Sequence, residues 1–180
     1  MCKMKGLIIF FFLVLTTAAM GQGKSEELIG WNAGQKLTWA DYKGKPKENS
    51  DAAASTATYL GFEFNVGRDG FNYKITCTFS KTKSWGLHKT DYILTHEQGH
   101  FDIAEIFARK LNKIMSGYKF DKNSFKEDLK TIYESIALEK DALQNQYDVE
   151  TNHSIKREKQ EEWLRKISDQ LQELAPFSGY

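Results

Sequence analysis

Residues 90–114 read TDYILTHEQGHFDIAEIFARKLNKI, and over this stretch the hydrophobic period changes from two to about three and a half. Thr90 and Asp91 can cap a helix and place an anion at its start. The residues of the predicted inward face recur at helical spacing: Ile93, His100, Ala104, Phe107, Leu111 and Ile114. The pattern therefore predicts a long helix that begins near Thr90 and buries one face.

This predicted helix carries the segment His96-Glu97-Gln98-Gly99-His100. Residues four apart on a helix lie about 6 Å apart along the axis and roughly 40° apart around it, so both imidazoles can face one ion. Zinc binds neutral imidazole nitrogens and, in a catalytic site, keeps one position for a water that a nearby carboxylate can deprotonate. The spacing predicts zinc ligands at His96 and His100 and a general base at Glu97. The alternative is a surface helix that binds nothing.

Gly99 interrupts this helix with a residue that costs about 1 kcal/mol relative to alanine. A close approach of another backbone would explain why a side chain is missing there.

A catalytic zinc site usually takes a third protein ligand. The segment 147–153, Tyr-Asp-Val-Glu-Thr-Asn-His, interrupts the apolar pattern and is interpreted as a loop that can reach the site. His153 is the predicted third ligand and Glu150 the alternative, although the segment could instead only cap the next helix. Asp148 is expected to accept a ring N–H from a ligand histidine. Tyr147 could donate to a developing oxyanion or complete an apolar stripe.

Before the helix the chain has the pattern of strands. Phe62, Phe64 and Val66 alternate with polar residues, as do the residues from Phe71 to Phe79, and Arg68-Asp69-Gly70 separates the two runs. An Asp-Gly pair supplies the positive φ of a tight turn, so the pattern predicts an antiparallel hairpin with one apolar face. Cys77 falls on that face and is expected to be a core residue.

Two further helices are expected after the first, from about Asn123 to Tyr147 and from about Ser154 to Leu174. Their apolar stripes consist of Phe125, Leu129, Ile132, Ile136, Leu143 and Tyr147 in the second helix, and of Trp163, Ile167, Leu171 and Leu174 in the third. The predicted fold class is α+β, with N-terminal antiparallel strands or hairpins followed by three main helices.

The N-terminus has the order of a signal peptide: basic residues, an apolar run from Leu7 to Leu15, and then small residues. The run is shorter than the roughly 20 residues of a membrane span. Residues 1–21 are therefore expected to be a signal peptide, cleaved after Gly21 or Ala19, and residues 22–180 a single periplasmic or secreted domain. No integral membrane span is expected after cleavage.

The whole chain has 25 basic and 24 acidic residues. Such a near-neutral balance without a dense basic patch argues against nucleic acid or an anionic membrane as the main partner. Cys77 is the only cysteine after Cys2, so no internal disulfide is expected in the exported domain.

The chain resembles the bacterial domain of unknown function 922 family, which is described as putative secreted zinc-dependent proteases. The matching segments are 37–42 with Gly44 and Pro46, 56–58, Trp85, 96–102, 108–109, 147–148 with Glu150, Thr151 and His153, and Trp163. The segments HEQGHFD and YDxETxH are the specific part, and Ser154 stands where relatives are expected to have glycine. The resemblance implies a protease.

Together these features predict a zincin-like hydrolase in which zinc is held by His96, His100 and His153. Its expected substrate is a peptide or protein. The alternatives are an amidase that acts on cell-wall peptides and a non-catalytic envelope module with a structural zinc. Sequence alone leaves the substrate and the oligomeric state open.

Overall fold

The structure, a computed structural model, describes residues 26–46, 50, 52–68 and 70–180. The expected signal peptide and Asp69 of the expected turn lie outside these residues. The strands are β1 (Leu28–Gly30), β2 (Ala54–Ser55), β3 (Thr58–Gly67), β4 (Gly70–Ser80) and β5 (Trp85–Gly86). The helices are η1 (Trp39–Asp41), α1 (Asp91–Ser116), α2 (Phe125–Thr151), α3 (Arg157–Glu173) and η2 (Ala175–Phe177).

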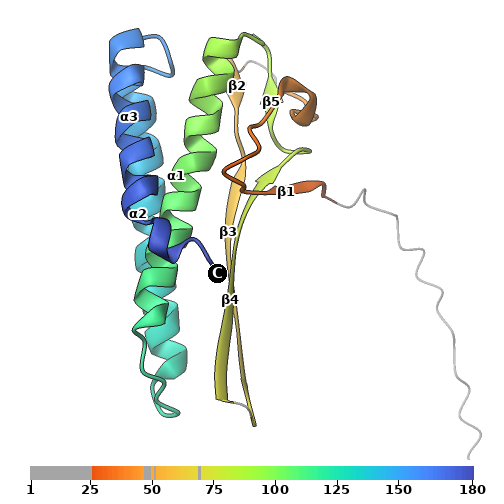
Figure 1. Ribbon diagram of the computed structural model, residues 1–180. Helices are drawn as coiled ribbons and strands as arrows, with labels where there is room; N and C mark the ends of the chain where they lie inside the picture. The colour runs from red at the N-terminus through yellow and green to blue at the C-terminus, as the bar shows by residue number, and fades with distance from the viewer. Residues whose placement is uncertain (1–25, 47–49, 51, 69) are drawn as a thin grey trace, which may run out of the picture.

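The longest β structure is the predicted hairpin of β3 and β4, which runs beside the helices over most of the molecule's length (Figure 1). Its register pairs Thr58 with Phe79 at one end and Gly67 with Gly70 at the other. Gly70 has a φ of +98°, a conformation that glycine adopts without steric cost. β1 adds to the outer side of β4, which gives the strand order β1-β4-β3.

The apolar face of the hairpin is buried only near the β1 end. Ile75, Cys77 and Phe79 are at most 4% exposed, and they belong to the same core as Ile103 and Phe107 of α1. The prediction for Cys77 is therefore confirmed.

Helix α1 is central to the fold because it packs against the sheet on one side and against α2 and α3 on the other (Figure 1). It begins as expected, and the side chain of Thr90 accepts a hydrogen bond of 3.2 Å from the N–H of Ile93. Antiparallel strands followed by three helices form an α+β fold, which confirms the predicted class. Within the described residues, none of the helices has the length and apolarity needed to cross a membrane.

The second helix is longer than predicted, and the interpretation of residues 147–153 as a loop is wrong. Helix α2 continues to Thr151, and Asp148 and Glu150 lie in its last turns. These residues are polar because their side chains have specific partners, not because the chain leaves the helix there. Asn152 caps the end of the helix, and Asn152, His153 and Ser154 all have positive φ angles, from 49° to 72°. This left-handed run turns the chain toward α3.

Candidate metal centre

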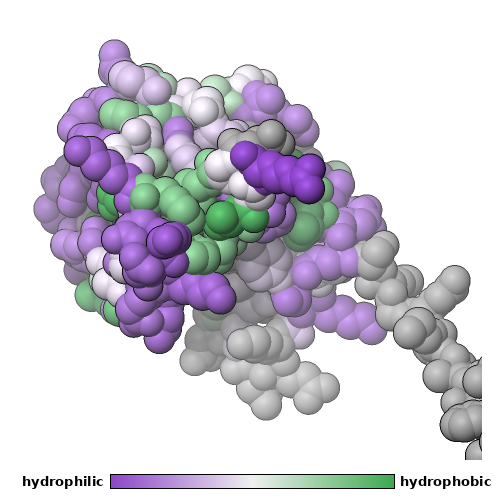
Figure 2. Space-filling model, turned by 90° about the horizontal axis from the view of Figure 1, so that it is seen from below, coloured by the Kyte–Doolittle hydropathy of each residue, from purple (hydrophilic) through white to green (hydrophobic). Residues whose placement is uncertain are grey.

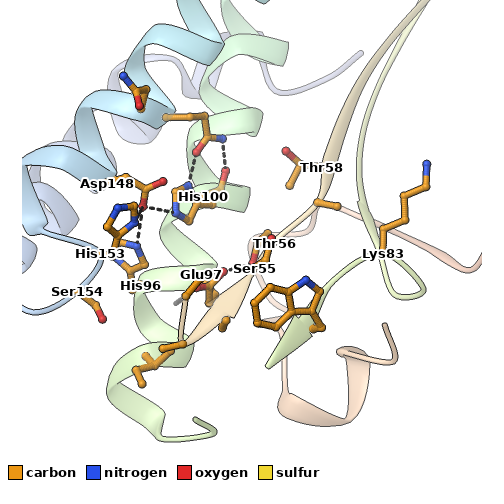
Figure 3. A pocket seen from close by; sticks show the side chains of 18 of the residues that line it. Ser55, Thr56, Thr58, Lys83, His96, Glu97, His100, Asp148, His153 and Ser154 are labelled. Atoms are coloured by element: carbon orange, nitrogen blue, oxygen red, sulfur yellow. Dashed lines mark hydrogen bonds and ion pairs between the residues drawn. The ribbon is translucent and has the colours of Figure 1, made fainter. Parts of the chain in front are cut away.

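A cleft of about 750 Å³ lies between the first half of α1, the C-terminal part of α2 and the extended segment from Ala52 to Tyr59 (Figure 3). Its lining includes His96, Glu97, His100, Asp148 and His153. Helix α1 supplies the first three of these residues, and α2 with its C-terminal turn supplies the other two. The cleft thus gathers most of the candidate residues from segments about 50 residues apart in the sequence.

His96, His100 and Asp148 form a group that could hold a metal ion, because each offers a ligand atom within 4.8 Å of the other two. The Nε2 atoms of His96 and His100 both lie 3.1 Å from Oδ1 of Asp148. Asp148 was expected to orient a ligand histidine from outside the ligand set. The structure instead places its carboxylate between the two imidazoles, where it can be a ligand itself.

The contact between His100 and Asp148 shifts the pKa values of both residues. Burial opposes the ionisation of Asp148, but hydrogen bonds from His100 and His96 outweigh it and hold the pKa of Asp148 well below its usual value. Burial also disfavours a charged His100, yet the hydrogen bond with Asp148 and the charges of Glu97 and Asp148 raise the pKa of His100. In the metal-free protein a protonated His100 therefore donates from Nε2 to the ionised Asp148 in a charge-assisted contact.

His153 lies beside this group, at the mouth of the cleft. Its Nδ1 is 3.4 Å from the same Oδ1 of Asp148, and its side chain is 67% exposed. Its φ of 50° is one that residues with a Cβ rarely adopt. The ring nitrogens of three histidines thus surround one carboxylate oxygen (Figure 3). The role of His153 as third ligand stays a prediction.

Gln144, one turn before Asp148, fixes the orientation of His100. Its side-chain N–H donates to the main-chain carbonyl of His100 at 2.8 Å, so its Oε1 faces Nδ1 of the ring and accepts from it. Nδ1 then carries a proton, and loss of the Nε2 proton leaves a neutral ring whose Nε2 can bind a metal. Sequence reasoning missed Gln144. If the second helix had been predicted to include Asp148, the spacing of four residues would have placed Gln144 on the same face of that helix as Asp148.

Tyr147 packs beneath the histidines and is fully buried. Its ring stacks on that of His96 with 4.4 Å between centroids, and its hydroxyl donates to the carbonyl of His96 at 3.3 Å. Burial and the charge of Glu97 raise the pKa of Tyr147. This geometry agrees with the packing role, because the hydroxyl that was considered as an oxyanion donor points into α1.

The same tyrosine explains Gly99. A Cβ on Gly99 would lie 2.6 Å from the hydroxyl of Tyr147 and 3.0 Å from its ring. The close approach that the sequence predicted is real, but a buried side chain makes it, not another backbone.

Glu97 also lines the cleft and is 4% exposed. Its Oε2 accepts a hydrogen bond of 2.6 Å from the hydroxyl of Thr56, on the segment that follows β2. Figure 3 shows Glu97 between the histidines and the segment that carries Thr56. A carboxylate and a possible metal group therefore share one cleft.

Glu150, the alternative third ligand, is bound elsewhere. Its carboxylate accepts hydrogen bonds from Gln146 at 2.7 Å and from the indole of Trp163 at 2.8 Å. These two contacts lower the pKa of Glu150 and tie it to α3, so the structure does not bring it to the cleft.

A family model described as bacterial protein of unknown function (DUF922) matches residues 45–154, which is more than half of the chain. The chain belongs to the DUF922 family. The DUF922 match contains β2 to α2, and with them Glu97, His96, His100, Asp148 and His153. No curated protein and no solved structure matches the chain.

Proposed function

We propose that this DUF922 protein is a zinc-dependent hydrolase, and that its substrates are peptides. The observation that carries the proposal is the presence of Glu97 in the same cleft as His96, His100 and Asp148. A carboxylate that is not itself part of the metal group, but lies beside it, is the arrangement that water activation requires.

The side chains fit zinc by their chemistry. Two imidazoles and a carboxylate are ligands that Zn²⁺ prefers, and His153 adds a third imidazole at the mouth of the cleft. Gln144 holds His100 in the tautomer that a ligand needs. When bound, zinc supplies a Lewis acid that polarises a carbonyl and makes water more acidic.

The protein's own groups carry the protons. Glu97 accepts a proton from the attacking water and later delivers it to the nitrogen of the leaving amine, so that water and an amide become an acid and an amine. The hydroxyl of Thr56 holds one oxygen of the Glu97 carboxylate while the other remains available for this transfer.

The wall of the cleft that faces the metal group favours an extended peptide as the substrate. The N–H of Leu87 donates to the carbonyl of Ala53, so Ala54 and Gly86 form a pair without mutual hydrogen bonds. The main-chain groups of Ala54 therefore point away from β5, and Ala54 is one of the residues that line the cleft. A peptide can add to such a strand edge by main-chain hydrogen bonds.

We further propose that the protein is exported to the periplasm or secreted, on the signal-peptide pattern of residues 1–21. The basic and acidic residues of the chain are nearly balanced in number, which suits a peptide substrate better than nucleic acid.

The test is the variant Glu97→Gln. It should keep stoichiometric zinc, measured by elemental analysis, and lose roughly 100- to 10,000-fold of the wild-type kcat on a quenched fluorescent peptide library. Glu134→Gln, on the exposed face of α2, is the matched control and should behave as wild type. Full hydrolysis by a zinc-loaded Glu97→Gln protein would exclude this mechanism.

One observation favours a second candidate, a non-catalytic module with a structural zinc. Four possible donors, from His96, His100, His153 and Asp148, lie together, and four protein ligands are typical of closed structural sites. In that case X-ray absorption would find four protein ligands and no water, and no peptide would be cleaved. Including cell-wall peptides in the library tests the amidase alternative in the same experiment.

A further inference from the structure

Three residues from different parts of the chain form a line of hydrogen bonds that ends on Glu97. The hydroxyl of Tyr42, just after η1, lies 2.9 Å from Oγ1 of Thr56, and the hydroxyl of Thr56 donates to Oε2 of Glu97 at 2.6 Å. Within the described part of the chain, Thr56 is the only hydrogen-bond partner of the Glu97 carboxylate. The line therefore acts on one carboxylate oxygen.

The direction of the line follows from counting protons. An ionised carboxylate can only accept, and a threonine hydroxyl has a single proton to donate. Since Thr56 gives its proton to Glu97, Tyr42 must give its own to Thr56. Both donors thus point toward Glu97, and each hydrogen bond strengthens the next.

Tyr42 is well suited to hold the outer position. It is 5% exposed, and its ring lies between Trp39 and Phe79 with centroid distances of 4.9 and 5.0 Å. Burial raises the pKa of Tyr42, so its hydroxyl keeps its proton throughout the physiological range. A buried ring with two aromatic neighbours gives the hydroxyl a fixed place.

We propose that Thr56 is a positioning residue for Glu97, with Tyr42 as its support. Thr56 holds Oε2 of Glu97 against the wall of the cleft, so that the carboxylate presents Oε1 to the reacting water in one orientation. The catalytic consequence rests on the proposed function, whereas the orientation of Glu97 is a property of the metal-free protein as well. Displacements of about 1 Å from such a position cost on the order of 100-fold in rate.

The alternative is that Thr56 only stabilises the chain where it leaves β2. The variant Thr56→Val separates the two roles, because it keeps the shape and β propensity of threonine and removes the hydroxyl. Thr56→Ser keeps the hydroxyl and removes the methyl group. Thr78→Val, on β4 and outside the cleft, is the matched control for the chemical change.

The first experiment compares crystal structures of the metal-free wild-type and Thr56→Val proteins, and it needs no activity. The Glu97 carboxylate should occupy one orientation in the wild type and turn away or occupy several in Thr56→Val. An unchanged Glu97 in Thr56→Val would overturn the proposal. This arm decides the positioning role even if the wild type cleaves no peptide, an outcome that would refute the proposed function alone.

The second experiment measures kcat and KM of the zinc-loaded proteins on the quenched peptide library. Thr56→Val should lose about 10- to 100-fold in kcat with KM within about threefold, and Thr56→Ser should restore most of the loss. Tyr42→Phe keeps Thr56 in place, and its kcat should fall about 3- to 10-fold. This variant tests the proposal if Thr56→Val does not fold. If Thr56→Val folds, a wild-type kcat in both Thr56→Val and Tyr42→Phe would overturn the proposal. If Thr56→Val does not fold, a wild-type kcat in Tyr42→Phe would overturn it.

Discussion

Helices α1 and α2 connect two ends of the molecule, and aromatic side chains pack together at both. Histidine rings take part at one end, and phenylalanine rings at the other. At the cleft end His96 lies 4.4 Å from Tyr147 and 4.9 Å from His100. At the other end Phe120 lies 5.4 Å from Phe71 and 5.1 Å from Phe125, between the hairpin tip and the turn after α1. Figure 2, which views this second end, shows apolar surface in the middle of the face and polar surface around it. We call the two regions the cleft end and the hairpin end.

The difference lies in the ring nitrogens. Each imidazole at the cleft end carries two nitrogens, and most of them have polar partners such as Asp148 and Gln144. Nδ1 of His96 is buried and has no partner among the described residues. The phenylalanines of the hairpin end make no such demand and stabilise the fold by apolar contact alone. Substitutions at the two ends should therefore separate metal binding from stability.

The largest effect is expected from His100→Ala, which removes a proposed ligand. Zinc affinity, measured by competition with a chromophoric chelator, should fall by more than the roughly 100-fold that loss of an outer partner causes. The metal-free variant should remain folded by circular dichroism, because the core around Phe107 and Leu111 is intact. Wild-type zinc affinity in this variant would remove His100 from the ligand set.

A smaller loss is expected from Gln144→Leu, which keeps the packing volume but removes the acceptor of the His100 ring N–H. Zinc affinity should fall about 10- to 100-fold by the same competition assay. Gln146→Leu on the same helix is a suitable control, since Gln146 is exposed and its side chain donates to the Glu150 carboxylate. Equal affinities of the two variants would contradict the role given to Gln144.

At the hairpin end, Phe71→Ala should lower the free energy of unfolding by about 2 kcal/mol. This is less than the 3–5 kcal/mol typical of a fully buried phenylalanine, because Phe71 is half-buried. Urea denaturation measures the loss, and zinc affinity should stay within about threefold of wild type. A large fall in zinc affinity would mean that the two ends are coupled.

The smallest effect concerns pH. Because its pKa is raised, His100 stabilises the metal-free fold at pH values below 6.5, its pKa in the unfolded chain. This stabilisation is lost as the pH rises through the pKa of His100 in the folded protein. Because its pKa is lowered, Asp148 stabilises the fold at pH values above 3.8, its pKa in the unfolded chain. This stabilisation is lost as the pH falls through the pKa of Asp148 in the folded protein. Between pH 3.8 and pH 6.5, the free energy of unfolding of the metal-free wild type should therefore exceed that of Asp148→Asn by about 1 kcal/mol.

Thermal denaturation of the two metal-free proteins at pH 5.5 and pH 8.5 measures this difference. The difference in stability between wild type and Asp148→Asn should be smaller at pH 8.5, because His100 is then deprotonated. A constant gap would show that Asp148 acts by packing and not by its charge.

The sequence predicted those parts of the fold whose signal is local. The β3–β4 hairpin and the start of α1 follow from alternation, a turn and a cap within short stretches. The pairing of β1 with β4 joins residues about 50 apart through a strand of three residues, which is too short to have a period. The pairing of β2 with β5 was missed for the same reason.

The site divides in the same way. His96, Glu97 and His100 were predictable because one helix fixes their spacing. Asp148 was recognised as a partner of the histidines, but its distance from them depends on how α2 packs against α1. Thr56 lies 41 residues before Glu97, and nothing in its neighbourhood indicates that the two side chains meet.

Oδ1 of Asp148 brings the imidazoles together before any cation arrives. On the proposed function, metal uptake would then resemble ion exchange more than folding, because a cation would replace the proton of His100 in an assembled group. The rate of loading should depend on proton release and on access through the cleft, and little on chain ordering. We therefore expect that this DUF922 protein can be purified folded without metal and then charged with different cations for comparison.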